Sequence, residues 1–189
     1  VHVTGLFEPG DMNWETDRAN DEEGEPSLAE MTALAIDVLS RDDDGFFLMV
    51  EAGRIDHGHH AGNARRALDD TIALSDAVRA AVEKTDAADT LIVVTADHSH
   101  TLTISGYPKR GNPILGKVVG VDWIRGTGDV EGRDALGLPY MHVACPHFPF
   151  GVARAAYRCA ATALCCAQLG SVCFITGSYL FRPALATQC

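Results

Sequence analysis

Residues 1–144 contain no cysteine, and residues 145–189 contain no acidic residue. The first absence restricts any disulfide or thiolate metal site to the end of the chain, where all six cysteines lie. Their spacing is irregular, allows 15 disulfide pairings, and includes no Cys-x-x-Cys pair of the kind found in zinc sites. The sequence therefore leaves the redox compartment of the protein open.

Basic residues are scarce, with 15 Lys and Arg against 26 Asp and Glu and a formal net charge of −11. This imbalance opposes a broad electrostatic interaction with nucleic acid or with an anionic membrane surface, although acidic side chains can still bind divalent cations. The chain has 189 residues, of which 47% are apolar, so it can bury a substantial core and does not have the composition of a disordered protein.

The composition changes abruptly after Ala144. Residues 1–144 hold 12 basic and 26 acidic residues, a net of −14, whereas residues 145–189 hold three arginines and no acid. We expect a partial α/β catalytic domain at 1–144 and an atypical cysteine-rich tail at 145–189. The change indicates a shifted reading frame, an unspliced intron or an unusual terminus.

Two further expectations concern the ends of the chain. No residue from Cys159 to Phe181 is charged, so the stretch is long enough to cross a bilayer, but polar and glycine residues dilute its hydrophobicity. A transmembrane helix there stays an alternative. The chain opens at Val1 without an initiator Met or a signal-type segment, from which we expect it to be the middle of a longer protein.

Hydrophobic periodicity indicates alternating helices and strands. Ser27 and Glu30 form a capping-box pattern before a helix that runs to about Ser40, and GFFLMVE then has the unbroken apolar character of a covered strand. A loop rich in glycine and histidine, 53–62, precedes a second helix starting near Asn63 and a second apolar strand in DTLIVVTADHSH. This order predicts a doubly wound, mostly parallel sheet flanked by helices.

Both predicted strands end in a carboxylate, Glu51 after FFLMV and Asp97 after LIVVTA. In open α/β sheets, ligands bind beyond the carboxyl ends of the strands, so we expect these acids to share a site. Asp56 and His60 stand four residues apart, and one helical turn would present both to a metal ion. Asp97 is followed directly by His98, a second pair of oxygen and nitrogen donors.

Each of these residues also has an ordinary interpretation. An Asp-His pair at this spacing can be a helix ion pair, a histidine near a strand end can be a surface residue, and an acid there can cap the next helix. The concentration of five histidines in 57–60 and 98–100 favours the metal site. We expect Trp14 and Trp123 to be packing residues.

The segments GLFEPGDMNWE, FLMVEAGRIDHGHHAGNARRAL and TLIVVTADHSHTLTISGYPKRGNPILG resemble the catalytic core of alkaline phosphatases, of the branch with animal and some marine enzymes. The likeness extends from about Val1 to Val143. It implies an α/β enzyme, usually a homodimer, that hydrolyses phosphate monoesters to inorganic phosphate at alkaline pH with two Zn²⁺ and one Mg²⁺. It also implies an extracellular, cell-surface or periplasmic location, while the net negative charge indicates no nucleic-acid partner.

The resemblance assigns metal ligands residue by residue. Glu51 corresponds to the Mg²⁺ ligand, Asp56 and His60 to ligands of the first zinc, and Asp97 and His98 to ligands of the second. In the animal branch a Ca²⁺ site is expected from the Phe7 carbonyl, Glu8 and Glu25, with plain surface acids as the alternative. The third ligand of the first zinc has no counterpart here, because His142 and His147 lack the family's sequence context.

The nucleophilic serine of the family lies in an Asp-Ser-Ala motif, which this sequence does not contain. We expect that motif to precede Val1 in a longer protein and the chain alone to be nearly inactive. The competing functions are a non-catalytic metal-binding or interaction module and a related phosphodiesterase or sulfatase. The GLFEPGDM and GYPKRGNP segments favour a phosphomonoesterase over these enzymes.

Overall fold

A computed structural model describes residues 2–108, 110–118, 137–144, 172–177 and 185–188. Residue contacts divide the chain into two units, which are described separately. The first comprises Val1–Gly58, Arg66–Ser99 and Gln168–Cys189, and the second comprises His59–Arg65 and His100–Ala167. The boundary predicted at residue 144 from composition is a different kind of division and stays a prediction.

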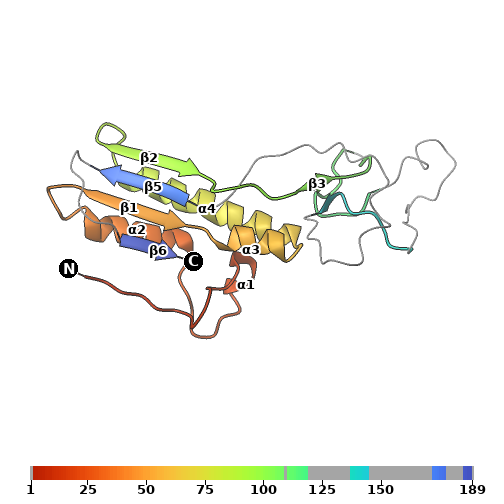
Figure 1. Ribbon diagram of the computed structural model, residues 1–189, viewed down its shortest axis with the longest axis horizontal. Helices are drawn as coiled ribbons and strands as arrows, with labels where there is room; N and C mark the ends of the chain where they lie inside the picture. The colour runs from red at the N-terminus through yellow and green to blue at the C-terminus, as the bar shows by residue number, and fades with distance from the viewer. Residues whose placement is uncertain (1, 109, 119–136, 145–171, 178–184, 189) are drawn as a thin grey trace. The chain divides into compact units, whose positions relative to one another are not determined.

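The first unit is built from helices packed on a mixed sheet (Figure 1). Its helices and strands are α1 (Glu15–Arg18), α2 (Leu28–Leu39), β1 (Phe46–Glu51), most of α3 (Arg54–His60), most of α4 (Ala64–Lys84), β2 (Thr90–Thr95), β5 (Val172–Gly177) and β6 (Leu185–Gln188). The second unit contributes the antiparallel pair β3 (Thr103–Ile104) and β4 (Val143–Ala144).

Helix α2 starts where the capping box predicts. The Ser27 hydroxyl accepts a hydrogen bond from the Glu30 backbone N–H at 3.2 Å, and the Glu30 carboxylate accepts one from the Ser27 backbone N–H at 2.8 Å. These bonds satisfy two amides that a helix start otherwise leaves unpaired. The buried Thr32 hydroxyl donates to the Leu28 carbonyl at 2.7 Å, so this polar side chain enters the core with its hydrogen bond made.

The sheet has the strand order β2-β5-β1-β6. Strand β5 runs antiparallel to both β1 and β2, and β6 runs parallel to β1. The α/β class expected from the sequence is therefore confirmed. The two strands predicted to follow each other in a parallel sheet do share a direction, but an antiparallel strand from the tail lies between them. The doubly wound arrangement stays a prediction.

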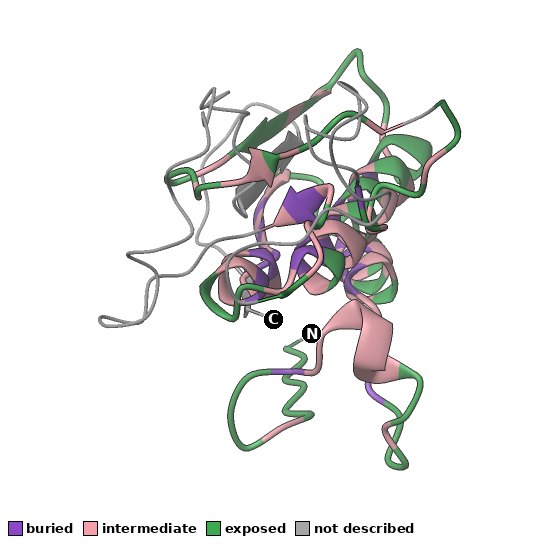
Figure 2. Cartoon of the chain, turned by 90° about the vertical axis from the view of Figure 1, so that its right-hand side faces the viewer, coloured by how far each residue is buried: buried purple, intermediate pink, exposed green. Residues whose placement is uncertain are grey.

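The core of the first unit lies between this sheet and the helices α2 and α4 (Figures 1 and 2). Its buried apolar residues come from α2, β1, the segment after β1, and α4: Leu28, Ile36, Leu48, Val50, Ala52, Ile55, Leu74, Ala77 and Ala81. On β2, by contrast, Leu91 is 63% exposed and Val93 is 41% exposed. The expectation that the strand GFFLMVE is covered on both faces is met only in part by β1, and the apolar strand β2 is largely exposed within the described residues.

Three sequence expectations have a different or limited outcome. The histidine-rich segment predicted as a loop forms the short helix α3. Among the described residues, no helix is long and apolar enough to span a membrane. Of the uncharged stretch Cys159–Phe181, only β5 is described, and the remaining residues, like Trp123 and His147, lie outside the described ranges.

Candidate metal centre

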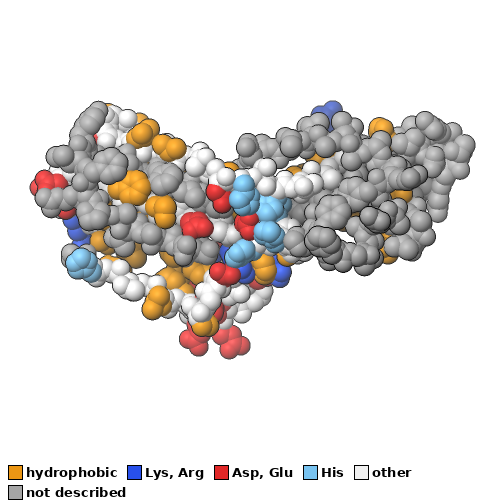
Figure 3. Space-filling view, in the orientation of Figure 1, with side chains coloured by type: hydrophobic (Ala, Val, Ile, Leu, Met, Phe, Trp, Pro, Cys, Tyr) orange, Lys and Arg blue, Asp and Glu red, His pale blue; other side chains and the backbone are white. Residues whose placement is uncertain are grey.

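The carboxyl ends of β1 and β2 open into one pocket of about 490 Å³. Glu51 closes β1, α3 follows it with Asp56 and His57, and Asp97 and His98 follow β2. In the space-filling view, acidic and histidine side chains gather where these strands end (Figure 3). The other lining residues belong to the N-terminal segment: Gly5, Leu6, Phe7, Glu8, Gly10, Asp11 and Met12, with Gly53 after β1.

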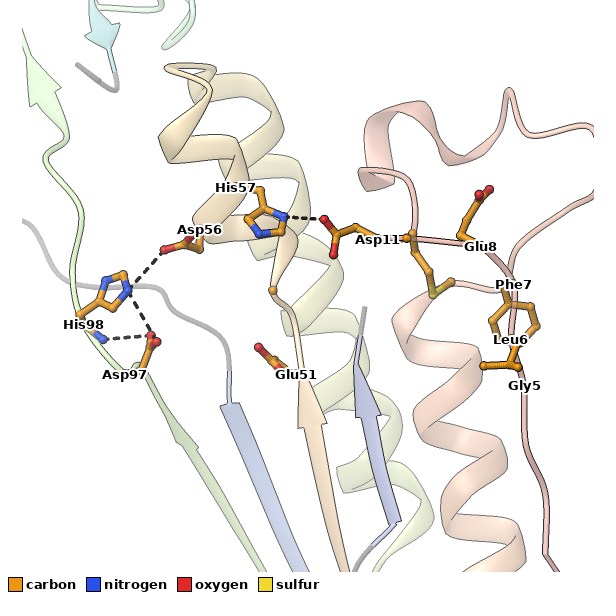
Figure 4. A pocket seen from close by; sticks show the side chains of 13 residues that line it. Gly5, Leu6, Phe7, Glu8, Asp11, Glu51, Asp56, His57, Asp97 and His98 are labelled. Carbon is orange, nitrogen blue, oxygen red and sulfur yellow. Dashed lines mark hydrogen bonds and ion pairs between the residues drawn. The ribbon is translucent and has the colours of Figure 1, made fainter. Parts of the chain in front are cut away.

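His98 is the meeting point of the predicted metal ligands (Figure 4). Its Nε2 atom lies 3.4 Å from Asp56 Oδ1 and 3.6 Å from Asp97 Oδ2. Two donors that bind one Zn²⁺ tetrahedrally at about 2.0 to 2.1 Å are roughly 3.4 Å apart, so these separations match a shared ion better than a tight hydrogen bond. The Asp97 carboxylate also accepts the His98 backbone N–H at 2.9 Å, which orients the Asp97 side chain.

One contact joins side chains that the resemblance assigns to different ions. Asp56 was expected beside His60 around one ion, and Asp97 beside His98 around another, whereas Asp56 also contacts His98 directly. His60 belongs to the second unit, where its ring meets the edge of His100 at a centroid distance of 4.9 Å. His59 stacks on His100 at 4.8 Å with an interplanar angle of 4°.

A second group of donors is entirely acidic. Ligand atoms of Glu8, Asp21 and Glu25 lie within 4.8 Å of one another. Glu25 is only 5% exposed, and its Oε1 atom accepts the Asn13 backbone N–H at 2.7 Å. Its Oε2 atom is buried without a hydrogen-bond partner among the described residues. A buried carboxylate oxygen is costly when unpaired, and a hard cation with oxygen ligands would satisfy it.

Of the eight predicted ligands, the pocket therefore collects Phe7, Glu8, Glu51, Asp56, Asp97 and His98. Glu25 joins Glu8 in the acidic group, so Glu8 lines the pocket and also faces the second group. Asp21 was not among the predicted ligands. Nothing in the local pattern separates Asp21 from its acidic neighbours, because only the fold brings it to Glu8.

Asp11 and His57 were also missed. The His57 Nδ1 atom lies 3.5 Å from Asp11 Oδ2 and 2.9 Å from Arg54 Nη1. The same Arg54 nitrogen lies 3.4 Å from Asp11 Oδ2. Because a guanidinium only donates hydrogen bonds, His57 Nδ1 accepts from Arg54, and in neutral His57 the ring proton is on Nε2.

The family model for alkaline phosphatase matches residues 1–127, about two thirds of the chain. The chain belongs to the alkaline phosphatase family. Its alkaline phosphatase relatives include the tissue-nonspecific isozymes of Gallus gallus, 58% identical over 114 residues, and of Homo sapiens, 51% identical over 115 residues. A membrane-bound alkaline phosphatase of Bombyx mori is 46% identical over 121 residues.

These alignments cover 60%, 61% and 64% of this chain, respectively, and 22% of each relative. The chain thus spans about a fifth of the length of the alkaline phosphatases it matches. The family is metal-dependent, and the two donor groups of the chain are candidate metal-binding groups. The tail from 145 onward lies outside the segment that the family model matches.

Proposed function

We propose that this chain forms one wall of the active site of an alkaline phosphatase that hydrolyses phosphate monoesters at alkaline pH. The observation that carries the proposal is the meeting of Asp56, Asp97 and His98 in one pocket at ligand-like separations. In this assignment the three residues hold Zn²⁺, with His60 as a further ligand of the first ion. Glu51 serves a Mg²⁺, and Phe7, Glu8 and Glu25, now joined by Asp21, serve a Ca²⁺.

The chemistry divides between the ions and the side chains. Divalent ions at such a centre supply positive charge to the attacking and leaving oxygens of phosphoryl transfer. Asp97 accepts the His98 backbone N–H, which fixes the orientation of its carboxylate. His57 presents a ring N–H when neutral, because Arg54 occupies its Nδ1 atom, and this donor suits a phosphate oxygen.

The reaction proceeds through a phosphoserine. A serine oxygen forms the bond to phosphorus while the ester oxygen leaves with a proton as the alcohol, and water then releases inorganic phosphate and restores the serine. This sequence contains no Asp-Ser-Ala motif, so the serine comes from a part of the protein beyond this chain. The active enzyme is a homodimer with a complete, doubly wound sheet. It is located outside the cell or at its surface, as the name of the membrane-bound relative suggests.

Residues 1–144 form part of the catalytic domain in this proposal, and residues 145–189 form an atypical tail. A non-catalytic metal-binding module is the second candidate, favoured by the lack of the serine motif. A related phosphodiesterase or sulfatase would use the same types of ligand. Activity in a complete enzyme framework separates these possibilities.

The experiment grafts residues 1–127 into the human tissue-nonspecific relative in place of its matching segment. The chimera is assayed with a nitrophenyl monoester, diester and sulfate. We expect turnover of the monoester, reduced at least about tenfold by Asp97→Asn and unchanged by Asp43→Asn in an exposed turn. A soluble, folded chimera that prefers the diester or sulfate, or is inactive with all three, would overturn the proposal.

A further inference from the structure

Two arginines of the first unit contact the Trp14 ring. The Cζ atom of Arg54 is 3.8 Å from the indole centroid, and that of Arg66 is 3.9 Å away. Both guanidinium groups therefore pack directly against the indole ring. The indole N–H also donates to the Arg54 carbonyl at 3.1 Å. Cation–π contacts of this kind are attractive, and more strongly so when they are shielded from water.

Arg54 connects Trp14 to the pocket. The Arg54 side chain is only 13% exposed, and its Nη1 atom contacts both His57 and Asp11, which line the pocket. Arg54 also begins α3, the helix that carries Asp56. The position of Trp14 therefore bears on the orientation of α3 and of the donors beside Asp56.

Asn13 connects Trp14 to the acidic group of Glu8, Asp21 and Glu25. Asn13, the neighbour of Trp14, donates its backbone N–H to Glu25 Oε1 at 2.7 Å. Glu25 meets Glu8 and Asp21, and its second oxygen is the buried one without a partner among the described residues. An ion held there would fix the Glu25 carboxylate and, through it, the backbone at Asn13 and Trp14.

We propose that Trp14 is a positioning residue that couples the two metal groups, so that a divalent ion at Glu8, Asp21 and Glu25 raises the pocket's affinity for Zn²⁺. The proposal rests on the proposed function, since it takes Asp56, Asp97 and His98 as zinc ligands. Repulsion between two cations opposes binding at both groups, whereas ordering of the segment before α1 favours it. With Trp14 present, the favourable ordering of the segment before α1 outweighs the repulsion between the two cations. Without Trp14, only the repulsion remains.

The test measures linkage in the whole chain by isothermal titration calorimetry. Zn²⁺ is titrated with and without saturating Ca²⁺, and Asp97→Asn identifies the pocket's share of the heat, because the six cysteines are the same in both proteins. We expect Ca²⁺ to lower the Zn²⁺ dissociation constant at least fivefold. Zn²⁺ must lower the Ca²⁺ dissociation constant by the same factor, since coupling is reciprocal.

Three variants separate coupling from folding. Trp14→Leu should remove the Ca²⁺ effect on Zn²⁺ binding, and Trp14→Phe, which keeps an aromatic face but loses the N–H donor, should retain part of it. Glu25→Gln should weaken Ca²⁺ binding and reduce the Ca²⁺ effect on Zn²⁺ binding. Circular dichroism checks that each variant is folded. In a Trp123→Phe background, the fluorescence of Trp14 reports directly whether Ca²⁺ changes the environment of this side chain.

The outcomes distinguish the two proposals. If Zn²⁺ binds equally to the unaltered chain and to Asp97→Asn, the zinc site fails and takes the coupling with it. If Asp97-dependent Zn²⁺ binding is present but Ca²⁺ does not strengthen it, only the coupling is overturned. An undiminished Ca²⁺ effect in folded Trp14→Phe and Trp14→Leu would equally remove Trp14 from its role.

Discussion

Gly58 of α3 lies close to the backbone of α4. A Cβ atom at this position would lie 2.7 Å from the Ala67 backbone nitrogen and 3.0 Å from its Cα. These are backbone atoms, so a rotamer change cannot relieve the clash, and one helix must move. The glycine therefore allows α3 to hold Asp56 and His57 at the pocket.

We predict that Gly58→Ala destabilises the chain by about 1 to 2 kcal/mol, because overpacking exceeds the gain in helix propensity. Urea unfolding measures the change. Gly10→Ala is the matched control, since a Cβ there meets nothing within 4 Å, and its effect should stay within about 0.5 kcal/mol. Equal stability of the two variants would mean that the close approach of α3 and α4 is not required.

Asp70 on α4 is the residue whose environment changes its acidity most clearly. Burial raises the pKa of the Asp70 carboxyl to about 6, with the charge of Glu15 adding to the increase, while the Glu15 backbone N–H and the charge of Arg54 oppose it. The folded state thus favours the protonated form. The contribution of protonated Asp70 to the stability of the folded chain is fully present below the unfolded pKa of about 3.9. It is lost as the pH rises through 6.

We predict that Asp70→Asn removes this pH dependence while keeping an acceptor for the Glu15 N–H. Relative to the unaltered chain, the variant should become more stable by up to about 3 kcal/mol between pH 4 and pH 7. Urea unfolding at several pH values provides the measurement, with Asp43→Asn as the exposed control. Parallel stability curves for the unaltered chain and Asp70→Asn would contradict the prediction.

At the scale of elements, α2 owes its starting point to two side chains. Ser27→Ala should cost about 1 kcal/mol, because the Glu30 backbone N–H loses its acceptor. Ser40→Ala at the exposed far end of α2 is the control and should change stability by less than half as much. Thermal and urea unfolding test the difference, and a Ser40 effect as large as that of Ser27 would show that the cap is unimportant.

The helix and the strands differ in how far they could be predicted. The capping box lies within four residues, so α2 was predicted with its start and end. The apolar runs predicted β1 and β2, but not that β5 would pair between them, since strand pairing depends on residues far away in the sequence. Helix α3 was taken as a loop because Gly53, Gly58 and Gly62 weaken helix propensity, which packing against Ala67 overrides.

At the scale of the whole molecule, the chain combines two candidate metal-binding groups with a sequence that lacks the serine motif. We predict that the isolated chain binds Zn²⁺ but hydrolyses a nitrophenyl monoester at less than about a hundredth of the rate of the chimera. Paired binding and activity assays with and without EDTA test this. Robust, EDTA-sensitive turnover by the isolated chain would show that it holds its own nucleophile.

By itself, the sequence determined the α/β class, the limits of α2, the acids at the ends of β1 and β2, and the membership of the alkaline phosphatase family. All of these depend on patterns within short segments. Only the tertiary structure decided that Asp56 meets His98, that Asp21 lies beside Glu8 and Glu25, and that Arg54 and Arg66 both contact Trp14. The reason is that a hydrogen bond within a helix spans four residues, whereas contacts between segments depend on how their buried faces pack.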